Sequence, residues 1–456
     1  MRAAESSLHP PRVPGGFPLL GHTPHLMRNP LSFLRSLPAA GELVEVRLGP
    51  WPAYVVCSPR LTRQLLLDDR TFDKGGPLID RAREALGDGV ATCPHARHRR
   101  QRRLNQSAFH QARMPAYATR MTAHLDALTA SWEAGRSVDV LTALEETAVR
   151  ILIGTMFLGT PLPAAEQTRM VHDVLGISRG VFRRMFMPPA LAKLPLLGNR
   201  GFEKARTHLR HTALRTIAHH RDTGRDYGDL LSTLVGAQDP GADAESARLS
   251  DEELADTIIT YFFAGAETSA ALAAWAVYFT ARHPEVEKQV QEEADRVLGG
   301  AAATHDDLPR LETARRVITE TLRVRPPGWI FTRVTARDTL LGPYRLPEGS
   351  TLLYSQYLAH HRDDDFPDPD RFDPDRWAGQ GPGGTPPSGS FVPFALGARK
   401  CIGDTFATME ATLALATIAS RWTLRPAPGM RLRTSPRGLV LRPDGLRMIP
   451  TPRARV

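Results

Sequence analysis

The chain has 456 residues, of which 42% are hydrophobic and 23% are charged. This composition is ordinary for a globular enzyme, and it excludes a disordered chain, a collagen and a coiled coil. A chain of this length can bury a large core without covalent staples. Its three cysteines are too few for a disulfide framework, and their odd number favours a reducing compartment.

The net charge is +9, from 58 basic and 49 acidic residues. Only one stretch is dense in positive charge, and it holds Arg97, Arg99, Arg100, Arg102 and Arg103. Basic chains often bind nucleic acids, but no zinc-finger spacing or RNA-binding signature accompanies these arginines. We therefore expect no nucleic-acid partner. The stretch is either a solvated basic face or a docking face for an acidic protein.

The first half of the chain predicts an arm, a hairpin and many helices. Residues 1–30 are polar and rich in proline, which predicts an extended arm and no export signal. Residues 42–56 alternate around a Gly-Pro pair and predict a β-hairpin. Prolines predict a break within 181–199, and residues 238–248 form a polar loop. Apolar residues recur at helical spacing through 59–234, most clearly over 121–132 and 140–157.

The longest apolar segment covers residues 258–281 and could cross a bilayer by length alone. It carries Glu267 near its centre, and a charge there would be costly in lipid. Ser250 and Glu253 precede it at the spacing of a capping box, so a helix is expected to begin at this point. We therefore predict a helix buried in a protein core and no membrane span.

Beyond residue 325 the pattern changes to short strands and turns. A loop rich in proline and glycine covers 367–390, and a helix is predicted over 404–422. We predict a mainly α (α+β) fold, in which residues 31–456 form one large helical domain with a minor β-sheet region. The expected strands lie at 332–340, 344–346 and 351–354, and in the tail 423–456.

The strongest motif lies at 394–403 and fits the pattern F-x-x-G-x-R-x-C-x-G. From the composition, such a match arises by chance in about one of ten thousand sequences. Gly397 and Gly403 would allow the backbone to fold closely around the sulfur of Cys401. Backbone N–H groups and the start of the next helix could stabilise a thiolate there. The other two cysteines lack the pattern and are expected to be buried structural residues.

Two shorter motifs occur before this run. Glu320 and Arg323 share one helix face, although a lone pair at this spacing is usually a weak surface ion pair. Ala264 opens the run A-G-A-E-T inside the long apolar segment. The hydroxyl of Thr268 can bond the carbonyl of Ala264 and open the helix locally. Glu267 is either a proton supplier or a buried acid in an ion pair.

These motifs resemble those of the cytochrome P450 family, and the resemblance covers nearly the whole chain. It implies the P450 fold and heme b, with Cys401 as the axial thiolate ligand and Phe394 in the same loop. It also implies that Glu267 and Thr268 serve the catalytic delivery of protons, because oxygen activation consumes them. A further implication is a buried structural cluster of Glu320, Arg323 and Arg376.

The same resemblance suggests which residues hold the heme and line the substrate pocket. Arginine suits the heme carboxylates, since its planar fork matches them. The implied heme-binding residues are His98, Arg102, Arg333, Arg399 and Phe394. The expected pocket residues are Phe263, Ala264, Trp329 and Ile330. Phe182, Met185, Phe186 and Met187 fall in the region of the substrate-access cover.

The likeness to soluble bacterial members implies a monomeric, cytoplasmic monooxygenase that uses O2, a ferredoxin and a ferredoxin reductase. Arg99, Arg100 and Arg103 are the expected ferredoxin-docking cations. The expected substrate is an apolar small molecule, and the stretch 188–202 resembles actinomycete sesquiterpene hydroxylases. We therefore predict hydroxylation, or further oxidation, of a cyclic terpene in secondary metabolism. A fatty acid or a macrolide is the alternative substrate.

Two other functions stay open, a heme protein that binds or senses without turnover and a peroxide-driven relative. The acid–alcohol pair at 267–268 favours the oxygen-activating enzyme. A D-D-x-x-D run at 364–368 matches the magnesium-diphosphate motif of terpene synthases, but its partner motif is missing. We expect an ordinary loop there.

Overall fold

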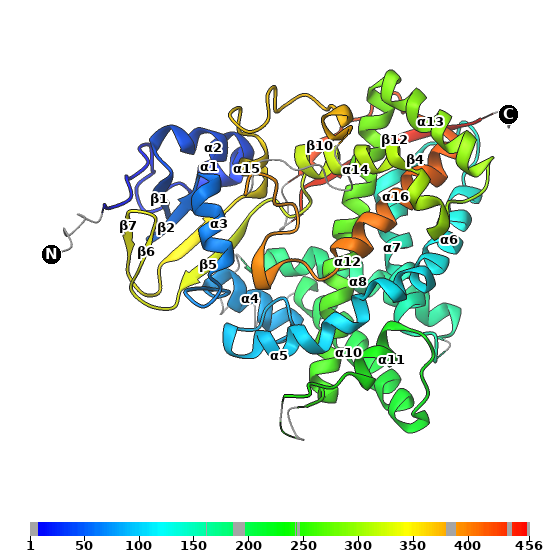
Figure 1. Cartoon of the computed structure of the whole chain (residues 1–456), viewed down its shortest axis with the longest axis horizontal. Helices are drawn as coiled ribbons and strands as arrows, with labels where there is room; N and C mark the ends of the chain where they lie inside the picture. The colour runs from blue at the N-terminus through cyan, green and yellow to red at the C-terminus, as the bar shows by residue number, and fades with distance from the viewer. Residues whose placement is uncertain are drawn as a thin grey trace.

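The computed structural model describes residues 8–160, 162–185, 197–241, 243, 247–379, 389–435 and 440–453. A sheet region with the N-terminal helices lies on one side of the molecule in Figure 1, and a larger body of helices lies on the other. The helices are α1 (Thr23–Arg28), α2 (Pro30–Ser36), α3 (Pro59–Leu67), α4 (Pro77–Leu86), α5 (His95–Gln106), α6 (Met114–Ala130), α7 (Val140–Met156), α8 (Ala164–Met185), α10 (Leu197–Thr223), α11 (Leu230–Gly236), α12 (Asp251–Arg282), α13 (Pro284–Leu298), α14 (Glu312–Val324), α15 (Gln356–His360) and α16 (Asp404–Arg421).

The strands are short and form four small sheets. The largest has the order β1-β2-β8-β5-β3 and is mixed, because β2 and β8 are parallel while the other pairs are antiparallel. The strands are β1 (Leu43–Leu48), β2 (Trp51–Val56), β3 (Phe72–Asp73), β4 (Val138–Asp139), β5 (Phe331–Thr335), β6 (Thr339–Leu341), β7 (Tyr344–Leu346), β8 (Thr351–Tyr354), β9 (Trp422–Pro426), β10 (Arg433–Ser435), β11 (Arg442–Asp444) and β12 (Arg447–Pro452).

The long helix α12 runs through the middle of the helical body (Figure 1). It begins as predicted, because Ser250 and Glu253 form a complete capping box, and it ends before Pro284. Most of its side chains are buried against α7, α10 and α16. None of the described helices combines the length and the apolar character that a bilayer span requires.

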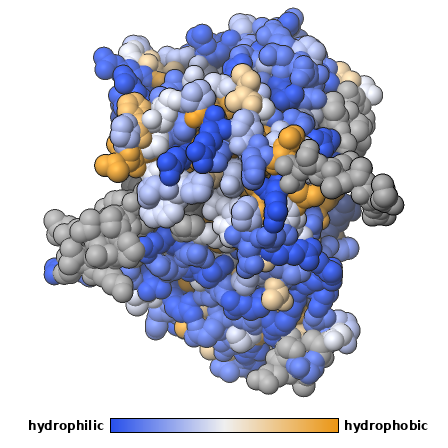
Figure 2. All heavy atoms as spheres, turned by 90° about the vertical axis from the view of Figure 1, so that its left-hand side faces the viewer, coloured by the Kyte–Doolittle hydropathy of each residue, from blue (hydrophilic) through white to orange (hydrophobic). Residues whose placement is uncertain are grey.

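The largest sheet has an apolar cluster on each face, because successive side chains of a strand point to opposite sides. Val44 and Val46 pack with α2, whereas Leu43 and Val56 pack with α3. The hairpin predicted over 42–56 is confirmed as β1 and β2. The surface of this side of the molecule is mostly hydrophilic, with a few apolar patches (Figure 2).

The predicted arm is extended only in its first described part. Leu8 and Arg12 form bridges to Tyr344 and Glu45, so this part lies along the sheet. The chain then turns at Gly21 and forms α1, which corrects the expectation of an extended segment up to residue 30. A proline at the second position of α1 suits the start of a helix and explains why a proline-rich stretch becomes helical.

The predicted break within 181–199 is described only at its ends. The helix α8 continues to Met185, and α10 begins at Leu197. Phe186 and Met187 lie outside the described residues, as do the side chains of Phe182 and Met185.

Candidate active site

A cavity of about 880 Å³ lies between α12 and the loop that carries Cys401. Its wall comes from α4, α5, α12, β5, β8 and the segments around residues 328 and 440. Most of the predicted site residues meet here although they are far apart in the sequence. Those that line the cavity are His98, Arg102, Phe263, Ala264, Glu267, Thr268, Arg333, Phe394, Arg399 and Cys401.

The loop before α16 folds tightly, as predicted for a thiolate loop. The N–H of Cys401 donates a hydrogen bond to the carbonyl of Phe394 at 2.9 Å. Gly397 has a φ of +70°, and a Cβ there would lie 2.7 Å from the carbonyl oxygen of Leu66. Both facts require glycine. Gly403 also lies close to the sulfur, but its φ is −99° and a Cβ there would meet nothing closer than 3.7 Å, so its backbone does not require glycine.

Among the cysteines, only Cys401 lines the cavity, and its side chain is exposed there. Burial raises the pKa of the Cys401 thiol, and the backbone N–H of Gly403 opposes this by hydrogen bonding to the sulfur. Cys57 and Cys93 are buried elsewhere, and burial raises the pKa of Cys57 to about 12. Both fit the expected structural role.

On the opposite wall, α12 presents Thr268 and Glu267. The Thr268 hydroxyl donates to the carbonyl of Ala264 at 2.5 Å, which is the bond predicted from the sequence. Glu267 lines the cavity, and its Oε1 also forms an ion pair with Nη1 of Arg442 at 2.5 Å. It is therefore both a cavity residue and a paired buried acid, so the two interpretations of Glu267 are compatible.

One end of the cavity is lined by cations from several elements. Arg333 is buried, its Nε has no hydrogen-bond partner, and it has no carboxylate partner among the described residues. The amine of Lys74 donates to the carbonyl of Ala91 at 2.7 Å, and burial followed by Arg333 lowers its pKa to about 7. Sequence reasoning missed Lys74, and only the scarcity of lysine in this chain could have drawn attention to it.

The other predicted heme-binding side chains differ in whether they already have hydrogen-bond or ion-pair partners within the protein. Burial lowers the pKa of His98 to about 3, so the ring is neutral, and its Nδ1 has no partner. Arg102 donates to the carbonyl of Lys400. Arg399 donates to Asp73 at 2.6 Å, so its charge is already compensated.

The donor set fits the two carboxylates of a heme. A buried guanidinium without an anion is costly, and Arg333 and Lys74 together lack the negative charge that such a group would bring. Cys401 lies at the same cavity as the ligand that iron requires. The residues present therefore fit a heme, and the share of each in binding it remains a prediction.

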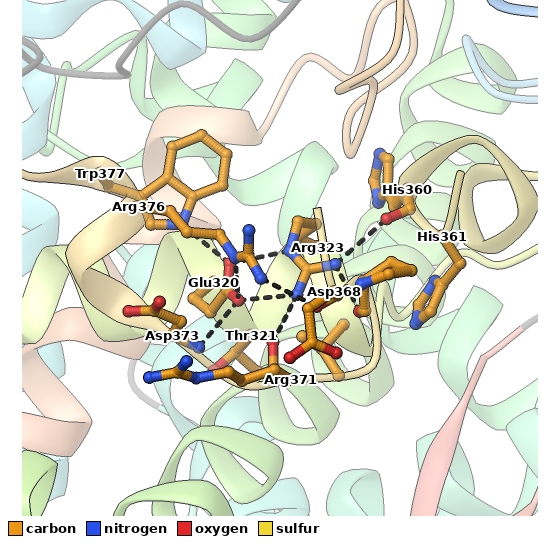
Figure 3. A network of polar contacts seen from close by, with 12 residues as sticks. Glu320, Thr321, Arg323, His360, His361, Asp368, Arg371, Asp373, Arg376 and Trp377 are labelled. Atoms are coloured by element: carbon orange, nitrogen blue, oxygen red, sulfur yellow. Dashed lines mark hydrogen bonds and ion pairs between the residues drawn. The ribbon is translucent and has the colours of Figure 1, made fainter. Parts of the chain in front are cut away.

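The predicted structural cluster is brought together between α14 and the segment 360–377 (Figure 3). Glu320 and Arg323 form a two-point ion pair at 2.7 and 2.9 Å, and both side chains are fully buried. Arg376 lies 3.4 Å from the same carboxylate, and Trp377 donates to it at 3.0 Å. Arg323 also donates to the carbonyls of His360, Pro369 and Arg371. The cluster thus ties α14 to the loop that leads to Cys401.

Two of the predicted pocket residues do not line the cavity. Trp329 is buried in the apolar cluster between the largest sheet and α2, and Ile330 packs against that cluster. The reason is that the sheet face beside α2 offers the indole a large apolar surface. Gly328 and Phe331 line the cavity instead. The sequence identified the segment but not the direction of each side chain.

The arginines around residue 100 are not a free basic face. Arg97 pairs with Asp88, Arg100 with Glu253 and Arg103 with Asp239. These pairs compensate part of the charge, but the side chains of Arg97 and Arg103 are still more than half exposed. The docking role of Arg99, Arg100 and Arg103 therefore stays a prediction. Arg99 makes no ion pair among the described residues.

The D-D-x-x-D run lies in a loop after α15. Arg362 pairs with Asp364 at 2.8 Å and with Asp365 at 3.3 Å. Within the part of the chain that the structure describes, no group of three histidine, cysteine or acidic side chains could hold a metal ion. That this is an ordinary loop without a synthase role stays a prediction.

Comparison with known proteins agrees with this geometry. The sequence model of the family described as Cytochrome P450 matches residues 11–450. The chain belongs to the cytochrome P450 family. P450 enzymes hold heme through a cysteine thiolate and use O2 and redox partners on apolar substrates. The structure, mainly helical with small sheets, is consistent with the P450 fold, and the chain is a monooxygenase of this family.

Curated relatives of high similarity are also P450 enzymes. The chain is 44% identical to cyclooctat-9-en-7-ol 5-monooxygenase of Streptomyces melanosporofaciens over 94% of each chain. It is 44% identical to cyclooctatin synthase of the same organism, over 97% of this chain and 95% of the relative. It is 42% identical to pentalenene oxygenase of Streptomyces avermitilis over 96% of each chain.

Proposed function

We propose that this P450 hydroxylates a cyclic terpene, in one or more oxidation steps of secondary metabolism. The observation that carries the proposal is the wall of the cavity. Away from the cations at one end, it is apolar and aromatic, with Leu86, Val90, Phe263, Phe331 and Val440 among its residues. A rigid hydrocarbon gains about 25 cal/mol per Å² of apolar surface that such a wall removes from water. The names of the similar enzymes support the same substrate class.

The cavity gives little support to the alternative substrates. Apart from Lys74 and the predicted heme-binding residues, the basic residues in the described lining are Lys400 and Arg442, and both are already paired with acids. A fatty acid would therefore find no free anchor for its carboxylate. A polar macrolide would leave its hydroxyl groups without partners against the apolar wall.

In the proposed reaction the chain binds, orients and supplies protons. Heme b, when bound, supplies the iron at which O2 is activated. The Cys401 sulfur would be its ligand, and Arg333 and Lys74 would hold its carboxylates. The apolar wall orients the terpene and excludes water. Thr268, held by the Ala264 carbonyl, keeps a hydroxyl at the cavity, and Glu267 carries protons to it.

For electron supply we propose a ferredoxin and a ferredoxin reductase. The protein would act as a cytoplasmic monomer. Arg99 remains a docking candidate and Arg70 joins it, since neither makes an ion pair among the described residues. Both are exposed and lie close in sequence to Asp69 and His95, which bond one another beside Arg399.

The substrate class is tested by titrating the heme-loaded enzyme while its spin state is recorded. We expect pentalenene and other cyclic terpenes to convert low spin to high spin, and long-chain fatty acids and macrolides to do so weakly. Tight conversion by an acid or a macrolide, with none by terpenes, would contradict the proposal.

Turnover distinguishes the other classes. Product should form with NADPH, ferredoxin and its reductase. A heme sensor would give no product, and a peroxide-driven enzyme would give product with hydrogen peroxide alone. The Thr268→Ala variant should still bind heme and terpene. Much of the NADPH it consumes should end as peroxide, and product should form about a hundredfold more slowly.

A further inference from the structure

Arg442 stands at the edge of the cavity with three carboxyl groups around it. Its Nη1 lies 2.5 Å from Oε1 of Glu267 and 3.0 Å from Oε1 of Glu145, and its Nε lies 3.2 Å from Oδ1 of Asp444. The acids come from three elements, α12, α7 and β11. The motifs of the sequence point to Glu267 alone, and nothing in them marks the other three residues.

The four side chains differ in how exposed they are. Asp444 is 30% exposed, Arg442 is 17%, Glu267 is 10% and Glu145 is 2%. Arg442, Glu267 and Asp444 line the cavity, whereas Glu145 lies behind them on α7. Water can therefore reach Asp444 more easily than Glu267. Glu267 in turn is the residue directly before Thr268 in the chain.

The chemistry of arginine decides what Arg442 does. A guanidinium keeps its proton at any physiological pH, and the acids around Arg442 raise its pKa further although burial opposes them. It therefore holds carboxylates but does not pass protons. Removing the partner of a single buried ion pair leaves an uncompensated charge, which is strongly unfavourable. Here Glu145 and Asp444 still compensate Arg442 when the Glu267 carboxylate takes up a proton.

We propose that Arg442 is the positioning residue for Glu267, and that Glu145 keeps Arg442 in place while Glu267 moves. In this scheme Glu267 accepts a proton from a solvent hydronium ion at the Asp444 end. The neutral side chain then leaves Arg442, gives the proton up beside Thr268, and returns to Arg442 as a carboxylate. The inference rests on the proposed role of Glu267 in proton supply.

The experiment compares Arg442→Gln and Glu145→Gln with the control Arg453→Gln in the heme-loaded enzyme. Arg453 also loses a buried ion pair, since it bonds Asp295 at 2.7 Å with a side chain 14% exposed, but it does not line the cavity. Measured quantities are the share of NADPH that ends as peroxide, the solvent isotope effect on the rate, and the reduced carbonyl spectrum as a measure of heme binding.

We expect Arg442→Gln and Glu145→Gln to lower the rate about tenfold, less than the hundredfold or more that removing a general acid costs. The peroxide share and the solvent isotope effect should rise, while the carbonyl spectrum stays that of the wild type. Arg453→Gln should lose stability without changing the peroxide share. If Arg442→Gln behaves like this control, the proposal is wrong.

A second measurement does not depend on turnover. A double-mutant cycle between Glu145→Gln and Arg442→Gln, read from urea unfolding, should show non-additive losses of stability. Additive losses would overturn the role of Glu145. If the wild type oxidises no terpene, the proposed substrate class fails, but the peroxide share of NADPH consumption still tests Arg442.

Discussion

The sulfur of Cys401 differs from the other two thiols in what surrounds it. It faces the large cavity, and a backbone N–H from the start of α16 stabilises its ionised form. Burial raises the pKa of all three thiols, but Cys57 and Cys93 are packed in the interior away from the cavity. At the scale of single residues, position and not residue type therefore separates the proposed metal ligand from structural cysteines.

Substitution of the cysteines tests this difference. Cys401→Ala should abolish the far-red-shifted Soret band of the reduced carbonyl complex, because no thiolate can then reach the iron. Cys57→Ala and Cys93→Ala should keep the band. Spectra of the three purified variants, recorded at equal protein concentration, check the prediction. A wild-type band in Cys401→Ala would contradict it.

Glu410 is a buried acid that the sequence motifs do not mark. It lies on α16, and burial raises the pKa of its carboxyl to about 8, although the nearby Ser269 hydroxyl opposes the shift. A carboxyl with a raised pKa in the folded state binds a proton that the unfolded chain has lost. Its stabilising contribution is complete below about pH 4.5 and disappears as pH rises through 8.

Glu410→Gln should remove this dependence. We expect the variant to gain on the order of 3–5 kcal/mol over the wild type between pH 5 and pH 8.5, since each pKa unit is worth about 1.4 kcal/mol. Urea unfolding of both proteins at the two pH values measures the difference. The exposed Glu292, changed to Gln, is the control. Parallel pH profiles for Glu410→Gln and the wild type would contradict the assignment.

At the scale of elements, the segment between α14 and β5 shows how neighbouring side chains divide between two tasks. Trp329 fills the apolar cluster beside α2, and its carbonyl accepts a hydrogen bond from Ser355 at 2.7 Å. Phe331 lines the cavity and stacks on Tyr354, with ring centroids 5.7 Å apart. One residue therefore supports the sheet and the other shapes the site.

The two aromatic residues should respond differently to truncation. Trp329→Ala should cost about 3–5 kcal/mol of stability, as expected for a large buried side chain, and leave terpene affinity almost unchanged. Phe331→Ala should weaken terpene binding about tenfold with a smaller loss of stability. Urea unfolding and spin-state titration measure the two effects. Equal losses of affinity in both variants would show that Trp329 also contacts the substrate.

At the scale of the whole molecule, ion pairs between distant elements absorb much of the positive charge of the chain. Arg100 and Arg103 of α5 pair with acids more than 130 positions later in the sequence, at Glu253 and Asp239. The electrostatic field that acts on an acidic partner therefore comes mainly from cations that are not in ion pairs. Arg70 and Arg99 are such residues, since both are exposed and neither makes an ion pair among the described residues.

Charge reversal tests whether the unpaired cations Arg70 and Arg99 bind the ferredoxin. Arg70→Glu and Arg99→Glu together should raise the apparent ferredoxin constant several-fold at low salt, and less at 0.5 M salt, because screening acts beyond about one Debye length. Substrate binding should not change. Steady-state reduction at varied ferredoxin concentration provides the measurement. Reduction that does not depend on salt in the wild type would argue against this docking face.

The sequence by itself determined the family, the long buried helix, the hairpin and the cysteine loop. Each of these depends on local chemistry, such as the capping box at Ser250, the helical spacing of Glu320 and Arg323, and the positive φ that Gly397 requires. The bond from Thr268 to Ala264 is equally local, because it joins residues four apart on one helix.

Only the tertiary structure decided the direction in which each side chain points and the partners of each charged group. Trp329 and Phe331 are two residues apart in one segment, yet only the packing of α2 on the sheet separates their roles. Lys74 meets Arg333, and Arg442 meets Glu145 and Glu267, because elements far apart in the chain converge on one cavity. Such contacts leave no periodic pattern in the sequence, since their spacing depends on the lengths of all the elements between them.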